Sequence, residues 1–451
     1  MRGVSDLKIS ISGIRGIVGR SFTPRLILDF TQAFSTYVGR GKVAVASDSR
    51  PTRDMVKHAV FSGLISSGNI PVDLGILPIP SFQVYVKESR ANGGIDITAS
   101  HNPVEWNALK LVLKGGRFPF SFEAEEIIDI YQQGSFRKER EFSQKIYEKD
   151  AFNYHKKKLF AFADYESIRR AKPKVVVDSC NGAGSPFVEK FLRELGCDVI
   201  AINTAPDSPF PHSPEPLPEN LTQLSHAVKE YGAELGFAQD ADADRLAVVD
   251  EKGNPIGEEY TLALAIISYL KYKKSSPIVV NLSTSKLIDD IGEDFKVKVF
   301  RSKIGEINVV EEMINYGAYI GGEGNGGVIA KDVHLCRDSF TGMVLILELL
   351  SKSGKRISEL KSELSEYYLM KDKLKVSLKE SILIMEKLKQ KYRRERLNFK
   401  DGIRIDTDRF WALIRPSNTE PVIRVYVEGI DEKEVRAVFS DIKGEIESLR
   451  R

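Results

Sequence analysis

The sequence has few cysteines, no long apolar run and almost no excess of one charge. Its three cysteines, Cys180, Cys197 and Cys336, are so widely spaced that they argue against a disulfide framework and against a zinc site. The longest apolar stretches, around residues 261–270 and 343–350, are much shorter than the ~20 residues of a membrane-spanning helix. We therefore expect both stretches to be core helices and expect no membrane partner.

The balance of charge argues against functions that need a strongly basic or acidic protein. Lys and Arg together number 66 against 63 for Asp and Glu, which gives a formal net charge of +3. This balance gives no reason to expect a nucleic-acid partner, so any positive charge that matters must be local. The first ten residues also lack the apolar core of a secretory signal, and we expect a cytoplasmic location.

The chain of 451 residues is too long for one hydrophobic core, because compact domains usually hold ~100–200 residues. Short apolar runs at residues 42–47, 174–177 and 277–280 each lead into a polar or glycine loop and then into a helical pattern. Strands that alternate with helices indicate parallel or mixed α/β sheets with functional loops. We predict an α/β protein with three similar mixed-sheet α/β domains, followed by a smaller α+β C-terminal domain.

Changes in composition indicate where these domains meet. Residues 134–150 are polar and rich in charge, and residues 250–255 form a turn cluster. From residue 371 onward the pattern predicts a charged helix at residues 380–396, two strands and a final amphipathic helix. The predicted domains are residues 1–150, 151–252, 253–368 and 369–451.

A candidate nucleophile lies in the loop TASHNP at residues 98–103, which follows a strand-like run at residues 94–97. The loop places the hydroxyl of Ser100, the imidazole of His101 and an amide in one turn at a strand end, where reactive groups are common. Taken alone, the pattern fits a helix cap or an Asn-Pro turn better than a catalytic site. Adjacent Ser and His do not define a triad, because a triad depends on spatial geometry.

A candidate metal site lies at Asp240, Asp242 and Asp244, where carboxylates alternate with alanine. On extended backbone, side chains at i, i+2 and i+4 project to one side, so the carboxylates converge and need a cation. Ligation by oxygen alone favours a hard ion such as Mg²⁺. A calcium loop is one alternative because Glu251 falls at its twelfth position, but Arg245 stands where that loop needs glycine. A solvated acidic turn is the other alternative.

A third loop, GGEGNGG at residues 321–327, is a candidate for binding a sugar. Its polar side chains are Glu323 and Asn325, a carboxylate and an amide two residues apart that suit vicinal hydroxyls. A flexible glycine turn is an equally good interpretation. The order of the glycines does not match a dinucleotide fingerprint.

A fourth loop, RPSNTEP at residues 415–421, lies between strand-like runs at residues 411–414 and 422–427. An arginine, two hydroxyls, an amide and backbone N–H groups in one tight loop are typical of a phosphate cradle. The alternative is a polar hairpin turn with an exposed arginine.

In their order and spacing these loops resemble the α-D-phosphohexomutase superfamily, which includes phosphomannomutases, phosphoglucomutases and phosphoglucosamine mutases. The resemblance extends from SGIRG at residues 12–16 to the loop at residues 415–421, and the serine and triple-aspartate loops are its most specific parts. It implies an isomerase that transfers phosphoryl groups, with one Mg²⁺ per active site.

The resemblance also implies roles for single residues. Ser100 would be a phosphoserine, and one of its phosphate oxygens would complete a metal site with Asp240, Asp242 and Asp244. Lys110 would be the candidate general acid/base. Arg15 and Arg245 would lie against the transferring phosphate, and His101 would be the remaining catalytic residue.

The substrate implied by the resemblance is a phosphosugar, converted between its 1-phosphate and 6-phosphate through a 1,6-bisphosphate that also serves as activator. Glu323 and Asn325 would bind the sugar, and closure of the fourth domain would exclude water. The phosphate that does not react would be bound by Arg415, Ser417, Asn418 and Thr419. A homodimer is the candidate assembly.

Two departures from the family pattern bear on the sugar. Asn325 stands where many members have serine, and Gly327 stands where many have histidine. The run SKIGE at residues 302–306 is more similar to the phosphoglucosamine mutase pattern. We expect a phosphomannomutase/phosphoglucomutase, with phosphoglucosamine mutase as the close alternative. A metal-dependent phosphohydrolase and a non-enzymatic sugar-phosphate or calcium-binding protein are the alternatives from other classes.

Overall fold

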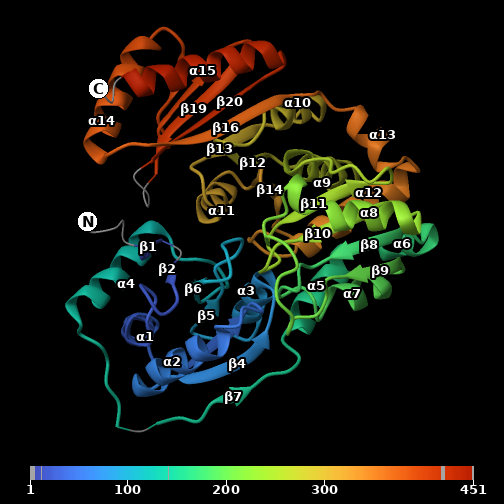
Figure 1. The fold of residues 1–451 in the computed structure, drawn as a ribbon. Coiled ribbons are helices and arrows are strands. Elements are labelled where there is room, and N and C mark those ends of the chain that lie inside the picture. The colour runs from blue at the N-terminus through green and yellow to red at the C-terminus, as the bar shows by residue number, and fades with distance from the viewer. Residues whose placement is uncertain (1–5, 12, 141, 418–421, 449–451) are drawn as a thin grey trace. The chain divides into compact units, whose positions relative to one another are not determined.

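Figure 1 shows the fold in a computed structural model of the chain. The described residues are 6–11, 13–140, 142–417 and 422–448. Three α/β domains with mixed sheets precede a C-terminal domain built on an antiparallel sheet, which confirms the predicted fold class. By compactness the chain forms two units. Unit 1 comprises Met1–Tyr269 and Gly326–Lys361, and unit 2 comprises Leu270–Asn325 and Ser362–Arg451.

The first sheet of unit 1 has seven strands in the order β1-β2-β6-β5-β3-β4-β7. Strand β3 runs parallel to β4 and β5, whereas β5 runs antiparallel to β6. Alternate residues of β3 and β5, among them Val43, Val45, Ile95 and Ile97, pack against α1 and α2 in one apolar core. The elements are β1 (Lys8–Ser10), β2 (Gly13–Ile17), α1 (Pro24–Val38), β3 (Lys42–Ser47), α2 (Arg53–Ser66), β4 (Ile70–Ile76), α3 (Ile79–Glu88), β5 (Gly93–Ile97), β6 (Trp106–Leu113), α4 (Ser121–Gln133) and β7 (Ile146–Tyr147).

The second sheet of unit 1 has the order β11-β10-β8-β9. Strand β8 runs parallel to β9 and β10, and β10 and β11 form an antiparallel hairpin. Gln239 pairs with Leu246 at the end of this hairpin, so residues 240–245 form its turn. The elements are α5 (Phe152–Phe162), α6 (Tyr165–Ala171), β8 (Lys174–Asp178), α7 (Val188–Leu195), β9 (Asp198–Ile202), the 3₁₀ helix η1 (Pro218–Asn220), α8 (Thr222–Tyr231), β10 (Leu235–Gln239) and β11 (Leu246–Asp250).

Both long apolar stretches of the sequence form helices of the core, as predicted. All residues from Ser339 to Leu350 are buried in α12, and Asp338 caps this helix by accepting a hydrogen bond from Phe340 N. None of the helices in the described ranges is long and apolar enough to cross a membrane. The elements concerned are α9 (Glu258–Tyr272), β15 (Gly327–Ala330), α12 (Ser339–Ser353) and α13 (Ile357–Ser362).

Unit 2 contains parallel strands of the third sheet and the whole C-terminal sheet. Strand β12 runs parallel to β13 on one side and to β14 on the other. Loops at their carboxyl ends therefore leave one edge of the sheet. The elements are β12 (Ile278–Asn281), α10 (Leu287–Asp294), β13 (Val299–Ser302), α11 (Glu306–Asn315) and β14 (Ile320–Glu323).

The C-terminal sheet is antiparallel, in the order β16-β20-β19-β18-β17. The predicted helix at residues 380–396 is wrong at its end, because α14 stops at Lys391 and residues 396–398 pair with β18 as an edge strand. Charged residues suit an exposed edge strand as well as a helix, so the sequence pattern does not separate the two. The elements are β16 (Tyr368–Lys375), α14 (Leu378–Lys391), β17 (Arg396–Asn398), β18 (Ile403–Asp406), β19 (Phe410–Pro416), β20 (Val422–Gly429) and α15 (Glu432–Ser448).

Candidate active site

The loop that carries Ser100 is held by a buried arginine. Because β3 and β5 are parallel neighbours, the loops at their carboxyl ends are adjacent. Arg50 is fully buried and donates to the carbonyls of Ser100 (2.5 Å), Asn102 (2.7 Å) and Pro103 (2.6 Å). Its Nε donates to Asp48 at 3.0 Å. No role was predicted for this pair, although the run DSR at a strand end is a signal for it.

Ser100 is held in a strained conformation. Its φ is 51°, in the left-handed region that costs a residue with a Cβ about 1–2 kcal/mol. Its backbone N–H donates to Thr98 Oγ1 at 2.9 Å, and with the Arg50 contacts this bond offsets the strain. The hydroxyl of Ser100 lies 3.1 Å from Asp240 Oδ2. The predicted nucleophile therefore points at the predicted metal site.

The three aspartates converge, but on a tight turn and not on the extended backbone that their spacing predicts. Their carboxylate oxygens lie within 4.8 Å of one another. The backbone between them is a tight turn and not extended, with Ala243 at a φ of 59°. Asp240 Oδ1 closes this turn by accepting hydrogen bonds from the backbone N–H groups of Asp244 (3.0 Å) and Arg245 (3.2 Å).

The aspartate oxygens divide into two sets. Asp242 Oδ1 and Asp244 Oδ1 are buried and have no hydrogen-bond partner in the described part of the chain. Leaving buried carboxylate oxygens without a partner is costly, and a hard cation would relieve that cost. Together with the adjacent Asp240 Oδ2 and Ser100 Oγ, these oxygens are a donor set that fits Mg²⁺.

The second set, Asp242 Oδ2 and Asp244 Oδ2, is in contact with cationic side chains. Lys110 Nζ lies 2.6 Å from Asp242 Oδ2, and Arg337 Nη2 lies 2.5 Å from Asp244 Oδ2. Burial opposes ionisation of Asp242, but Lys110 outweighs it and lowers the pKa of this carboxyl. The same contacts, with Asp242 first, raise the pKa of Lys110 against the effect of its burial. Lys110 is therefore held protonated.

The environment of His101 keeps its imidazole neutral. Its Nδ1 accepts a hydrogen bond from Arg245 Nη2 at 3.0 Å and lies 3.4 Å from Ser100 Oγ. Burial and then the Arg245 charge lower the pKa of His101 to about 2. At neutral pH His101 therefore orients Arg245 and has no proton to donate from Nδ1.

Arg15 and two unpredicted residues complete the surroundings of the serine loop. Arg15, on β2, donates to Asn102 Oδ1 at 2.6 Å. Glu215, in the loop before η1, lies 3.5 Å from Arg245 Nη1. Arg337 was missed altogether, because it stands 93 positions beyond Asp244 and only the fold brings the two together.

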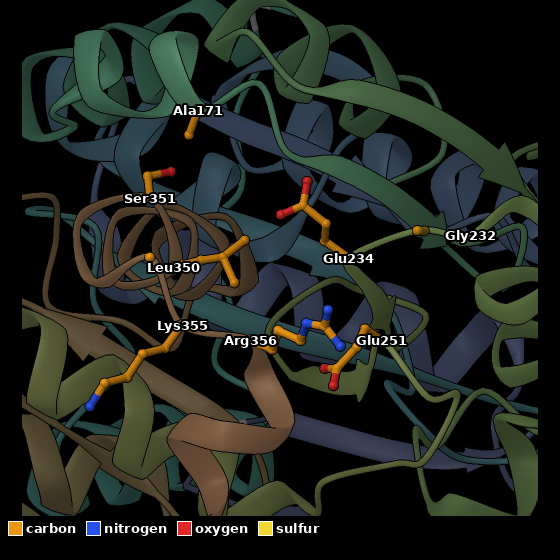
Figure 2. Close-up of a pocket in the computed structure, with 10 residues that line it drawn as sticks. Ala171, Gly232, Glu234, Glu251, Leu350, Ser351, Lys355 and Arg356 are labelled. Carbon is orange, nitrogen blue, oxygen red and sulfur yellow. The ribbon is translucent and has the colours of Figure 1, made fainter.

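Glu251 lines a separate pocket of unit 1. The pocket has a volume of about 500 Å³ and is lined by residues at the ends of α6, α8 and α12, and by Glu251 and Arg356 (Figure 2). Glu251 accepts hydrogen bonds from the backbone N and the Oγ of Ser358 and thereby anchors the start of α13. It does not join the aspartate cluster, so the calcium-loop alternative loses its twelfth ligand.

In unit 2 the predicted sugar loop is fixed by hydrogen bonds to its neighbours. Glu323, at the end of β14, is 3% exposed, and its Oε1 accepts from Asn281 Nδ2 (2.8 Å) and Gly305 N (2.9 Å). Gly324 N donates to Thr284 Oγ1 at 3.1 Å. These bonds argue against the interpretation of the glycine run as a merely flexible turn.

The predicted phosphate loop begins at the end of β19. Arg415 Nε donates to Asp401 Oδ1 at 3.1 Å, and Ser417 N donates to Val422 O at 2.8 Å. Asn418 and Thr419, the other two predicted ligands, lie outside the described residues.

Fold and site together define a phosphosugar-transforming phosphotransferase. Four domains of phosphoglucomutase/phosphomannomutase match the chain, namely α/β/α domain I at residues 7–138, domain II at 152–253, domain III at 258–368 and the C-terminal domain at 372–445. The chain therefore belongs to this family of phosphohexomutases, which are isomerases.

The relatives carry names that refer to two kinds of sugar substrate. A phosphoglucomutase/phosphomannomutase of Thermococcus kodakarensis is 37% identical over 94% of this chain and 95% of its own length. A probable phosphoglucosamine mutase of Methanopyrus kandleri is 36% identical over 96% of each chain. The fold is also that of a putative phosphomannomutase from Thermus thermophilus, with a TM-score of 0.84, 24% identity and coverage of 98% of this chain and 100% of the other.

Proposed function

We propose that this phosphohexomutase uses Ser100 as a reusable phosphate carrier between the 1- and 6-hydroxyls of a hexose. The observation that carries the proposal is the contact of Ser100 Oγ with Asp240, beside two buried aspartate oxygens that have no hydrogen-bond partner among the described residues. A hydroxyl in that place can belong to a metal-bound phosphoserine. The hydroxyl of Ser100 has no evident structural purpose in a strained turn.

The residues that would hold Mg²⁺ are Ser100, Asp240, Asp242 and Asp244. When bound, Mg²⁺ would neutralise negative charge on the transferring phosphoryl oxygens. Arg245 and Arg15, which flank the serine loop, would bind those oxygens as the charge develops. His101 would keep Arg245 oriented, and protonated Lys110 is the candidate acid for the departing oxygen.

The reaction would proceed in two balanced halves. In the first, the bond between Ser100 Oγ and phosphorus breaks, the free hydroxyl of the hexose 1-phosphate bonds to phosphorus, and its proton passes overall to Ser100 Oγ. The 1,6-bisphosphate then turns around, and the other phosphoryl group returns to Ser100 by the reverse exchange. Arg415 and Ser417 would bind whichever phosphate is not reacting, and Glu323 and Asn325 would bind the ring hydroxyls.

We infer mannose and glucose phosphates as the first substrates, with glucosamine phosphates as the alternative. The relatives support both names at nearly equal identity. Asn325 and Gly327 remain the positions on which we expect the preference to depend. A cytoplasmic location and a homodimer remain expectations of the sequence.

The test combines intact mass and turnover. The unmodified chain should carry one added phosphate after incubation with a hexose 1,6-bisphosphate, and Ser100→Ala should carry none. Ser100→Ala should also lose turnover by on the order of 10⁴-fold or more. Normal turnover by this variant would refute the proposal. Stoichiometric release of inorganic phosphate from the substrate would also refute it and would favour a hydrolase. Parallel assays on mannose, glucose and glucosamine phosphates would decide the sugar.

A further inference from the structure

A continuous chain of contacts in unit 2 links the predicted phosphate loop to the predicted sugar loop. Its central residue is Asp401, in the turn between β17 and β18, whose two carboxylate oxygens have different partners. Asp401 Oδ1 accepts from Arg415 Nε at 3.1 Å, and Asp401 Oδ2 accepts from the backbone N of Ile304 at 3.0 Å. The next residue, Gly305, donates its backbone N–H to Glu323 Oε1 at 2.9 Å. Every link is therefore a hydrogen bond or a peptide bond.

The middle of this chain is held in place from several sides. Asn308 Nδ2 donates to Ile304 O at 2.9 Å and closes the turn before α11. Lys400, next to Asp401, donates to Arg301 O at 3.0 Å, at the end of β13. The side chains of Asp401 and Arg415 are only 15% and 12% exposed, so their ion pair is shielded from water and stronger than a surface pair.

We propose that Asp401 is a positioning residue that fixes the distance between phosphate-binding Arg415 and ring-binding Glu323. The inference rests on the proposed function, because it takes the substrate roles of these two residues from there. A fixed distance favours a phosphosugar whose ring hydroxyls and phosphate match it and penalises a shorter one, because the misplacement of one contact by about 1 Å can cost on the order of 100-fold. Asp401 would therefore contribute to selectivity for hexose phosphates without touching the substrate.

The experiment measures binding of glucose 6-phosphate and ribose 5-phosphate by calorimetry, on the full chain and on Asp401→Ala. The unmodified chain should prefer the hexose phosphate, and Asp401→Ala should reduce the ratio of the two affinities about tenfold. Asp401→Asn should fall between them, because an amide has one acceptor oxygen for two donors. Asp372→Ala, which removes an ion pair with Lys443 in the same domain, is the matched control and should leave the ratio unchanged.

Three outcomes separate the possibilities. If Asp401→Ala weakens the binding of both ligands equally, or does not weaken it at all, the inference is overturned, even if the chain is a normal mutase. If the ratio falls but the unmodified chain interconverts no hexose phosphates, the proposed function fails and the spacing role stands. In turnover assays Asp401→Ala should raise KM about tenfold and change kcat little, and its effect should not multiply with that of Glu323→Gln.

Discussion

The two units hold their functional residues by different physical means. In unit 1 the serine loop is surrounded by buried charges, with three carboxylates opposed by Lys110, Arg245 and Arg337. In unit 2 the carboxylate of Glu323 is held by an amide and a backbone N–H, and a single ion pair links Asp401 to Arg415. Charge is thus concentrated where a phosphoryl group would be transferred, and backbone hydrogen bonds prevail where a sugar would be recognised.

This difference predicts which kinetic constants should change when residues of each unit are substituted. Clustered charges act on charge that develops in the transition state, so changes in unit 1 should lower kcat or metal affinity. Groups that bind the substrate equally before and during the reaction should affect KM. Four experiments test this contrast.

The largest effect is expected for Asp242→Asn. This variant removes a charged oxygen from the predicted metal site and leaves Lys110 without its closest carboxylate. We expect turnover to fall by on the order of 10³-fold, with little change in KM for the sugar phosphate. The control is Asp73→Asn, another buried aspartate of unit 1, whose partner Lys57 lies 3.2 Å away. Equal losses in the two variants would mean that Asp242 matters only for folding.

Arg337→Met should weaken the metal site without removing a ligand. Arg337 contacts Asp244 Oδ2 and so orients Asp244 Oδ1, which has no hydrogen-bond partner among the described residues. Removal of such an outer contact commonly costs 10- to 100-fold in metal affinity, which titration with Mn²⁺ would measure. Arg337→Lys should restore part of the affinity. Unchanged Mn²⁺ affinity in Arg337→Met would show that the contact is not needed for the metal.

Protonation of a buried histidine should make unit 1 sensitive to acid, and all six histidines of the sequence belong to unit 1. Burial lowers the pKa of His334 to about 4, and the unfolded value is about 6.5. A histidine whose pKa is depressed by folding stabilises the native state above the unfolded pKa and loses this contribution as pH falls toward the folded value. From pH 7 to pH 5 the loss is about 2 kcal/mol.

The lowered pKa of His101 acts in the same direction. The raised pKa of His212, which Asp178 causes against burial, acts in the opposite direction, as do the pKa values of Asp96 and Asp240, which burial raises. Hydrogen exchange at pH 7 and pH 5 would report the two units separately. His334→Gln should make unit 1 less sensitive to this change of pH. Equal acid sensitivity of unit 1 in His334→Gln and in the unmodified chain would contradict the prediction.

The smallest effect is expected for Glu323→Gln. The substitution keeps the shape of the side chain and loses one charge, so hydrogen bonds to sugar hydroxyls weaken. We expect KM to rise about tenfold with kcat within about twofold. Glu432→Gln, which breaks an exposed ion pair with Arg436, serves as the control in the same unit. A fall in kcat with unchanged KM would remove the contrast between the units.

Much of the fold was predictable because local patterns specify it. The strand-loop-helix units at β3, β8 and β12 were expected from short apolar runs followed by polar loops. The edge strand β17 was missed because its residues also suit a helix, and pairing with β18 decides between the two. The turn at Ala243 was missed because alternating aspartates look like a strand, whereas hydrogen bonds to Asp240 fold them into a turn.

The sequence alone indicated which loops are candidates for chemistry, since Ser100, the aspartates, Glu323 and Arg415 stand in motifs whose residue types suit phosphate, metal and sugar. The tertiary structure established which of those aspartate oxygens have no hydrogen-bond partner among the described residues, which cations contact the others, and that Asp401 contacts both Arg415 and Ile304. The reason is physical. Residue types and spacing fix local chemistry, but the protonation of Lys110, the neutrality of His101 and the partner of Arg337 depend on charges and burial contributed by distant segments.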